Sequence, residues 1–188
     1  MADFEIANAI TADCEGGYVN DKNDSGGETI FGIARNIHKD LKLWQIVDDY
    51  KKIVGDLSQK NNRQELEKLC LGNAEFVSQK NAFYKSQFWD KIRGDEIHSQ
   101  AVANNIYDFA VNAGVKQSVK ILQRVLNISD DGVFGNNTLN TCNNTQSTKL
   151  NNDFCAMRES FYKDLVKRKP QNEKFLNGWL NRVKRFYI

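Results

Sequence analysis

Proline, histidine and closely spaced cysteines are scarce in this sequence of 188 residues. It contains one proline and two histidines, and its four cysteines include no Cys-x-x-Cys pair. A local zinc motif or a dithiol redox centre is therefore excluded, and we predict neither a metal nor a cofactor. Three cysteines lie on apolar helical faces, so we expect them to be buried as small hydrophobic side chains: Cys14, Cys70 and Cys155.

Long apolar runs and low-complexity segments are also missing. No stretch approaches the roughly 20 apolar residues of a membrane-spanning helix, and residues 1–10 lack the basic start and apolar core of a signal peptide. We therefore expect synthesis in the cytoplasm without a signal peptide. The composition, 40% hydrophobic and 27% charged, is typical of a globular protein with one domain and at most a small appendage.

Glycine is concentrated in one segment, residues 14–33, which holds five of the twelve glycines. Apolar residues recur at helical spacing from Phe4 onward, and Asp3 is a candidate N-cap, so the pattern predicts a helix that ends near Glu15. Gly16 would close this helix in the left-handed conformation. A carboxylate at the negative end of the helix dipole, shielded by aromatic neighbours, keeps its proton to a higher pH, which suits a general acid.

A second carboxylate, Asp24, follows nine residues after Glu15 in a polar, glycine-lined turn, where it would stay ionised. Residues 18–19 and 29–33 are β-prone, so we expect a small hairpin that brings Asp24 and Thr29 back toward Glu15. Two carboxylates in contrasting environments are the arrangement that hydrolyses glycosidic bonds. Acidic residues in such turns also serve simply as turn formers, and the spacing alone leaves both interpretations open.

The same turn partly fits a calcium loop. Positions one, three, five and six of an EF-hand-like pattern are occupied by Asp21, Asn23, Ser25 and Gly26. Position twelve, which needs a bidentate glutamate, is Gly32. The calcium interpretation lacks its principal ligand and is set aside.

Two motifs stand in the glycine-rich segment: E-G-G-Y at residues 15–18 and D-S-G-G-E-T-I-F-G-I at residues 24–33. Together they resemble the signature of the glycoside hydrolase family 108 muramidases, some of which are labelled secretion activator proteins. The resemblance implies a lysozyme-like fold, cleavage of the glycan strand of peptidoglycan, and a catalytic acid at Glu15. Phage-type lysozymes carry a Glu, Asp, Thr set. Glu15 and Asp24 match its first spacing, whereas Thr29 comes one residue early.

Three further residues are candidates for substrate binding. Tyr18 closes the first motif. Asp108 and Asn112 lie one helical turn apart in D-F-A-V-N-A-G at residues 108–114, a segment that is similar to the same family. Their face differs from the apolar stripe of the surrounding helix, so they either line a polar groove or are solvated. The run Y-K-S-Q-F-W-D-K-I-R-G-D at residues 84–95 resembles the end of the family's catalytic domain.

Helical periodicity dominates the remainder of the chain. It predicts helices, the first of them interrupted, in these ranges: 34–54, 63–71, 73–89, 99–113, 122–126, 150–165 and 176–187. Residues 55–62 are expected to form a loop and residues 91–97 a turn. The stripe through Trp44 is expected in the core, with stacking on a sugar ring as the alternative. Pro170 ends the longest helix.

The second half of the chain carries a glycine turn and an excess of positive charge. The pattern D-G-x-x-G-x-x-T at residues 131–138 resembles the motif of small helical peptidoglycan-binding domains, which follow the catalytic part in this family. Residues 158–188 hold nine Lys and Arg against three Asp and Glu, a net charge of +6, so the remainder carries −4. Such an asymmetry attracts an anionic wall polymer or a membrane surface, although a solvated basic face is the commonest outcome.

These patterns predict a mainly α, lysozyme-like fold with a small β-hairpin lobe after the first helix. We expect residues 1–96 to form the catalytic part and residues 97–188 a peptidoglycan-binding-like part, packed as one compact, monomeric unit. The predicted function is hydrolysis of the β-1,4 bond between N-acetylmuramic acid and N-acetylglucosamine, with Glu15 as the acid. Asp24 would steer a water molecule or stabilise the transition state, and Thr29 would help to hold that water.

Three alternatives stay open on the sequence alone. A lytic transglycosylase would use Glu15 without Asp24 and leave anhydro-sugar ends. A non-catalytic wall-binding or secretion-accessory protein would not need Glu15. A nucleic-acid binder would use the basic C-terminal region, but the aromatics there fit an apolar stripe rather than base stacking, so we expect no nucleic-acid partner. The expected partner is the peptidoglycan glycan strand, which the protein reaches in the cell wall after export or release through a holin or a secretion system.

Overall fold

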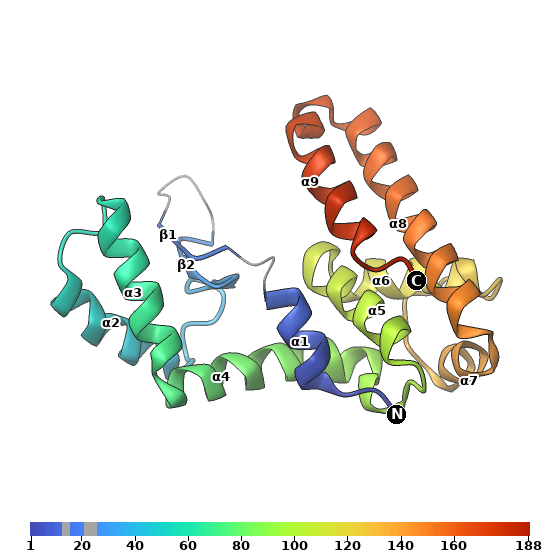
Figure 1. Ribbon diagram of the computed structural model, residues 1–188, viewed down its shortest axis with the longest axis horizontal. Helices are drawn as coiled ribbons and strands as arrows, with labels where there is room; N and C mark the ends of the chain where they lie inside the picture. Colours follow the sequence, from blue (N-terminus) through green and yellow to red (C-terminus); the bar gives the residue numbers. More distant parts are fainter. Residues whose placement is uncertain (13–15, 21–25) are drawn as a thin grey trace. The chain divides into compact units, whose positions relative to one another are not determined.

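The computed structural model describes residues 1–12, 16–20 and 26–188 (Figure 1). Within them the chain is mainly helical, as predicted, and the helices are Phe4–Ala12 (α1), Leu43–Val54 (α2), Lys60–Gly72 (α3), Ala74–Tyr84 (α4), Gln100–Ala113 (α5), Val115–Val125 (α6), Asn136–Asn144 (α7), Ser147–Arg168 (α8) and Glu173–Lys184 (α9). The strands are Tyr18–Asn20 (β1), Glu28–Ile30 (β2) and Ile33–Ala34 (β3). A π-helical turn, Lys85–Trp89, follows α4 directly. Among the described helices, none combines the length and the apolar character that crossing a bilayer requires.

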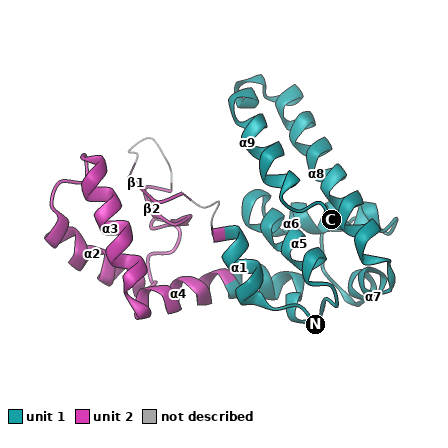
Figure 2. Cartoon of the chain, in the orientation of Figure 1, with its two compact units in different colours: residues 1–11, 85–188 teal, residues 12–84 magenta. Residues whose placement is uncertain are grey.

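The chain divides into two compact units (Figure 2). Unit 1 comprises residues 1–11 and 85–188, and unit 2 comprises residues 12–84. The predicted boundary between residues 96 and 97 separates a catalytic part from a peptidoglycan-binding-like part, which is a different division from that into compact units. It stays a prediction.

The helices of unit 2, α2, α3 and α4, pack against one another, and β1 packs against α3. Apolar side chains at helical spacing form its interior: Leu43, Trp44, Val47, Leu66, Cys70, Phe76 and Phe83. Trp44 is thus a core residue, as expected. Helix α3 begins at Lys60, so the loop predicted over residues 55–62 is shorter than expected. The Arg63 side chain, in the first turn of α3, donates to the carbonyl oxygens of Leu57 and Ser58 and so fixes the turn that precedes the helix.

The sheet has the order β1-β2-β3 with both pairings antiparallel, so the predicted hairpin is present and gains a third strand. Strands β2 and β3 pair through Ile30 and Ile33 across a two-residue turn. Both turn residues have positive φ, 45° at Phe31 and 75° at Gly32, which is the type I′ geometry that matches the twist of paired strands. Phenylalanine is strained there, and the Tyr84 hydroxyl holds it by donating to the Phe31 carbonyl oxygen at 2.6 Å.

Unit 1 is built around α5, in which residues 102–110 are all buried and which packs against α6 and α8. The ends of this helix are those that the sequence predicts. The Ser99 hydroxyl oxygen accepts from the Val102 N–H at 3.4 Å, and the chain leaves the helix at Gly114 with φ of 91°. Three aromatic rings meet edge to face in this core, with centroids 5.7 to 5.9 Å apart: Phe4, Trp89 and Tyr107.

Helices α8 and α9 form a long hairpin within unit 1 (Figure 1). The buried residues of α8 lie between Leu150 and Tyr162, and α9 buries only Val183. Helix α8 ends at Arg168, and Pro170 opens the turn that follows, as predicted. The outer half of the hairpin, residues 163–178, has no buried side chain.

The candidate functional site

Four of the six predicted site residues are described: Tyr18 and Thr29 in unit 2, and Asp108 and Asn112 in unit 1. The other two, Glu15 and Asp24, lie outside the described residues, as does Cys14. Strand β1 separates Glu15 from Asp24 in the sequence. The surroundings of β1 are therefore the described part of the structure that bears on these two carboxylates.

A carboxylate on the neighbouring strand, Glu28, accepts three hydrogen bonds. The donors are the Tyr18 hydroxyl at 2.9 Å, the Lys51 ammonium at 2.7 Å and the Arg35 guanidinium at 2.6 Å. Only 10% of the Glu28 side chain is exposed. Burial by itself would raise its pKa, but the hydrogen bonds from Lys51, Arg35 and Tyr18 outweigh burial and hold the pKa below its usual value. Glu28 is thus an ionised, immobilised carboxylate rather than a proton donor.

Arg35 links Glu28 to helix α2. Its two terminal amino groups also donate to both oxygens of Asp48, at 2.8 and 2.5 Å, and its guanidinium lies over the Trp44 ring, 5.0 Å from the centroid. The hydrogen bond from Arg35 lowers the pKa of Asp48. We call Glu28, Arg35, Lys51 and Asp48 the Glu28 cluster. Because its members come from β2, from the residue after β3 and from α2, the cluster ties the sheet to that helix.

Tyr18 joins β1 to two other elements. Its N–H donates to the Glu67 carboxylate of α3 at 2.7 Å, and its hydroxyl reaches Glu28. Burial, followed by the hydrogen bond to Glu28, raises the pKa of the hydroxyl far above its usual value. These contacts give Tyr18 a structural role in holding β1, and its part in substrate binding stays a prediction.

Thr29 is half-buried on the central strand of the sheet. Its backbone pairs with Val19 on one side and with Ala34 on the other. Its hydroxyl donates to the Gly27 carbonyl oxygen at 3.3 Å, which is a weak bond. The position is therefore rigid in the backbone, while the role of the hydroxyl in holding water stays a prediction.

A hollow of about 570 Å³ lies beside β1 in unit 2. It is lined by β1 and by the loop that leads into α3: Tyr18, Val19, Asn20, Asp56, Leu57, Ser58 and Arg63. The loop side is fixed, because Ser58 donates to the Asp56 carboxylate through its N–H at 2.9 Å and its hydroxyl at 2.7 Å. The volume is that of a small-molecule site, and the lining mixes apolar and polar groups.

The sequence connects this hollow to the predicted carboxylates. Strand β1 begins three residues after Glu15 and ends four residues before Asp24. The Glu28 cluster fixes β2, with which β1 pairs along its whole length. The hollow, β1 and the Glu28 cluster together are the candidate functional site of unit 2.

Asp108 is enclosed by protein, and the expectation that it lines a groove or is solvated is wrong. Its side chain is 0% exposed, and its oxygens accept from Arg158 at 2.6 Å and from Arg182 at 2.7 Å. Arg158 is equally buried and also donates to the Asn105 side-chain oxygen at 2.5 Å. Burying a charged carboxylate is costly unless cations neutralise it, and here α8 and α9 each supply one arginine. We call Asp108, Arg158 and Arg182 the Asp108 cluster.

Asn112 is exposed one turn further along α5. Its side-chain oxygen accepts from the Tyr162 hydroxyl at 2.5 Å, and the Tyr162 ring stacks on Trp179 with centroids 5.0 Å apart. This contact holds the α8–α9 hairpin to α5. A contact of Asn112 with substrate stays a prediction, and the structure does not bring it together with Tyr18 or Thr29 within one unit.

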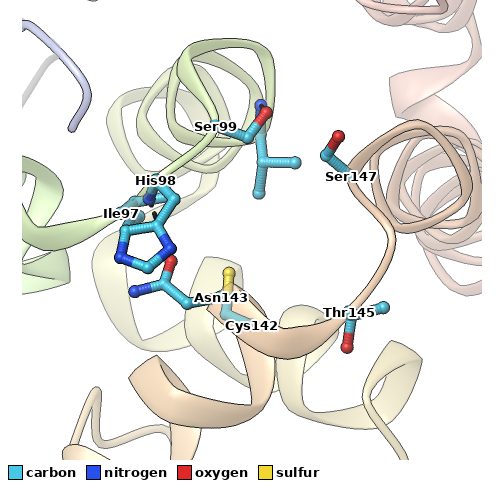
Figure 3. Close-up of a pocket in the computed structure, with 8 residues that line it drawn as sticks. Ile97, His98, Ser99, Cys142, Asn143, Thr145 and Ser147 are labelled. Carbon is cyan, nitrogen blue, oxygen red and sulfur yellow. Dashed lines mark hydrogen bonds between the residues drawn. The ribbon is translucent and has the colours of Figure 1, made fainter.

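A second hollow, of about 330 Å³, lies in unit 1 where the start of α5 faces the end of α7 and the start of α8 (Figure 3). The Ser99 and Ser147 hydroxyls stand on two of its walls, and the His98 N–H donates to the Asn143 side-chain oxygen at 2.9 Å. Burial raises the pKa of the Cys142 thiol to about 12, so it is not a nucleophile at neutral pH. The described residues of its lining include no carboxylate, so this hollow does not offer the paired acids of glycoside hydrolysis.

Sequence reasoning missed the Glu28 cluster. Glu28 stands inside the second motif, but a single glutamate in a short strand carries no signal of its partners. Asp48 and Lys51 do carry a signal in the sequence, because acidic and basic residues three positions apart share a helix face. That spacing would have indicated a charged face on α2, although not what it binds.

Two families match consecutive regions of the chain. Residues 8–114 match the family described as Glycosyl hydrolase 108, and residues 117–184 match the family described as Predicted Peptidoglycan domain. The first match contains all six predicted site residues. The two matches meet at the end of α5, so the predicted boundary between residues 96 and 97 lies inside the first match.

A solved structure is similar over nearly the whole chain. Brucella abortus SagA shares 25% sequence identity, and the similarity covers 97% of this chain and 90% of that chain with a TM-score of 0.63. This likeness confirms the predicted fold class. Among proteins with a curated function, none matches the chain. Because the first family match spans more than half of the sequence, the chain belongs to the glycosyl hydrolase 108 family.

Proposed function

We propose that this glycoside hydrolase acts on peptidoglycan and cleaves the β-1,4 bond between N-acetylmuramic acid and N-acetylglucosamine. The observation that carries the proposal is the pair of consecutive family matches, a glycosyl hydrolase region over residues 8–114 followed by a peptidoglycan domain over residues 117–184. The hollow beside β1 supports it, since its size and mixed lining suit one sugar of a glycan strand.

Glu15 is the proposed general acid. Glu15 follows the last residue of α1, Ala12, by three positions in the sequence, and a carboxyl group near the negative pole of a helix dipole keeps its proton more readily and can protonate the leaving glycosidic oxygen. Asp24 is proposed to steer the attacking water or to stabilise the oxocarbenium-like transition state, and Thr29 to help to hold that water. The Glu28 cluster would act on these groups only indirectly, by holding β2, which contains Thr29 and pairs with β1.

The place of action is the cell wall. We propose that the protein reaches peptidoglycan through a holin or a secretion system. Digestion of the wall from the outside by added protein tests the reaction without testing this route.

The decisive experiment compares the wild type with Glu15→Gln on purified peptidoglycan. If Glu15 is the acid, the variant loses a factor of roughly 10²–10⁴ in rate while it keeps its circular dichroism spectrum. The matched control is Glu65→Gln, an exposed residue of α3 whose pair with Lys68 is long at 3.8 Å, and it should keep full activity. Full activity of Glu15→Gln would overturn the enzymatic assignment of Glu15 and favour a non-catalytic wall-binding protein.

Mass spectrometry of the released fragments separates hydrolysis from the transglycosylase alternative. Hydrolysis adds one water for each bond that is cleaved, whereas a lytic transglycosylase adds none and leaves anhydro ends. Asp24→Asn should abolish most of the activity of a hydrolase, because the water loses its positioning group. Anhydro ends together with an active Asp24→Asn variant would replace the hydrolase with a transglycosylase.

A further inference from the structure

Unit 1 has an open groove of about 250 Å³ between α6 and α8, two helices that pack against each other. We define the α6–α8 groove by the residues that line it: Gln117, Ile121, Arg124, Met157, Ser160, Phe161, Asp164 and Arg168. All of them lie in the region that matches the Predicted Peptidoglycan domain. None of them is a residue that the proposed hydrolysis uses, so the groove has no role in that chemistry.

The floor of the groove is apolar and preformed. Ile121 is almost fully buried, and Met157 and Phe161 are half-buried beside it. The Phe161 ring is held edge to face against Phe109 at 5.4 Å and against Tyr162 at 5.5 Å. Because the ring is fixed from behind, the floor cannot close by rotation of Phe161, and small apolar groups can pack on it.

Two arginines stand on the walls with their terminal amino groups unoccupied. Arg124 donates through Nε to the Asp130 carboxylate at 2.6 Å, and Arg168 donates through Nε to the Asp164 carbonyl oxygen at 3.3 Å. The terminal amino groups of both donate to none of the described residues. A guanidinium anchored in this way presents its remaining N–H groups as a fork, which matches the two oxygens of a carboxylate.

The surrounding charge favours an anionic ligand. Asp164 is the one acidic residue of the lining, and its carboxylate accepts from Lys167 at 3.2 Å, so its charge is partly neutralised. Residues 117–184 hold eleven Lys and Arg against six Asp and Glu, a net charge of +5. Exposed lysines continue along the outer hairpin beyond Arg168, among them Lys169 and Lys174. Such a field concentrates anions near the groove.

We propose that the α6–α8 groove binds the stem peptide of peptidoglycan through its carboxylates. This proposal rests on the proposed function, in which peptidoglycan is the substrate. It names the part of peptidoglycan that residues 117–184 bind. The stem peptide combines alanine methyl groups with free carboxylates, which fit the apolar floor and the two guanidinium forks. The glycan itself offers amides and hydroxyls, because its lactyl carboxylates are consumed in the bond to the peptide. The α6–α8 groove therefore binds the peptide of the substrate, whereas unit 2 binds its sugars.

The test is calorimetric titration of the full-length protein with two soluble probes. One is the disaccharide–tetrapeptide that wall hydrolysis would release, and the other is the same disaccharide without the peptide and with its lactyl carboxyl group capped as an amide. We expect the peptide-bearing probe to bind more tightly by about tenfold or more, the worth of one or two charge-assisted pairs. The double variant Arg124→Gln with Arg168→Gln should bring the two probes to equal affinity, and Ser160→Trp, which fills the groove without changing charge, should do the same.

The matched control is Lys169→Gln with Lys174→Gln, which removes the same net charge from exposed residues that neither line the groove nor pair with its Asp164. It should retain the preference for the peptide within about twofold, since surface charges at this distance act weakly in salt. Equal loss in the two double variants would overturn the proposal in favour of general electrostatic attraction. Binding to vesicles of anionic phospholipid that depends on Arg124 and Arg168, with no preference between the soluble probes, would overturn it in favour of a membrane surface.

Failure of the groove and failure of the proposed hydrolysis are distinguishable. The calorimetric result does not require turnover, so a peptide preference can be present even if Glu15→Gln leaves wall digestion unchanged. Conversely, glycan strands stripped of peptide should be cleaved equally by the wild type and by the Arg124→Gln, Arg168→Gln variant. A loss of cleavage on these stripped strands would show that the arginines act on the reaction rather than on the peptide.

Discussion

The two units each hold a carboxylate between two cations, but in different surroundings. In unit 1, Asp108 and Arg158 are both 0% exposed, and Arg182 is 10% exposed. In unit 2, Glu28 is 10% exposed, whereas its partners Arg35 and Lys51 are 29% and 30% exposed. The Asp108 cluster is therefore embedded in a helical core, and the Glu28 cluster lies at the edge of a small one.

The difference reflects what each cluster has to hold together. Unit 1 already has a large aromatic and aliphatic core, and its cluster connects α5 to α8 and α9 inside it. Unit 2 has strands of only two and three residues, which bury little surface of their own. There the cluster supplies the contacts that a longer strand would obtain from its ladder. Water weakens the ion pairs of the Glu28 cluster but not those of the Asp108 cluster.

The largest effect should come from Asp108→Asn. The change leaves Arg158 and Arg182 without a buried counter-charge, and removing one partner of a buried pair costs about 3–5 kcal/mol. Urea unfolding followed by circular dichroism measures the loss. The control Asp153→Asn removes an exposed carboxylate from α8 and should cost less than about 1 kcal/mol. A similar small cost for Asp108→Asn would mean that the two clusters are equivalent, contrary to the comparison.

A smaller loss, about 1.5–3 kcal/mol, is expected for Glu28→Gln, because hydrogen bonds to a charged group are lost while part of the site stays in water. The effect should be confined to unit 2. Thiol labelling separates the units, since Cys70 is buried in unit 2 and Cys142 in unit 1, and burial raises the pKa of both thiols to about 12. Glu28→Gln should speed the labelling of Cys70 in dilute urea and leave Cys142 unchanged. Equal acceleration at both thiols would contradict a local role.

The same variant has a signed pH dependence. The folded pKa of Glu28 is lowered, so its contribution to stability is fully present above the unfolded pKa of about 4.3 and is lost as the pH falls through the folded value. The stability of the wild type over Glu28→Gln should therefore be constant near neutrality and shrink below about pH 4. Urea midpoints at several pH values measure it, and a difference that grows with acid would have the wrong sign.

The smallest effect is expected for Tyr18→Phe. It removes one of three donors to Glu28, while Lys51 and Arg35 remain, so the cost should be about 0.5–1.5 kcal/mol. Urea unfolding again provides the measurement. A larger cost than that of Glu28→Gln would mean that the Tyr18 hydroxyl has another partner of greater importance than the cluster.

Local signals in the sequence predicted most of the helices and some of their ends, although α2 begins at Leu43 instead of residue 34 and α6 at Val115 instead of residue 122. Asp3 accepts from the Glu5 N–H at 2.7 Å and caps α1, Ser99 caps α5, and the chain leaves the long helix α8 just before Pro170. These features depend on residues within about one helical turn, so they can be recognised in the sequence without knowledge of the fold. The early start of α3 was missed because Arg63 fixes a turn that precedes it.

The candidate site was less predictable. Asp108 looked like a residue of a polar groove because its helix face differs from the apolar stripe. Its partners stand 50 and 74 residues away, on α8 and α9, and no spacing rule links them. The substrate-binding role of Tyr18 stays a prediction, and its contacts with Glu67 and Glu28 on two other elements gave no signal in the sequence.

The sequence by itself determined the helical architecture, the position of the small sheet, the family and the order of the two matched regions. All of these rest on residue patterns that act over a few positions. Only the tertiary structure decided which charges are buried and which line a surface, because burial depends on elements that are distant in the chain. The Asp108 cluster inside unit 1 and the Glu28 cluster at the edge of unit 2 owe their contrast to that packing.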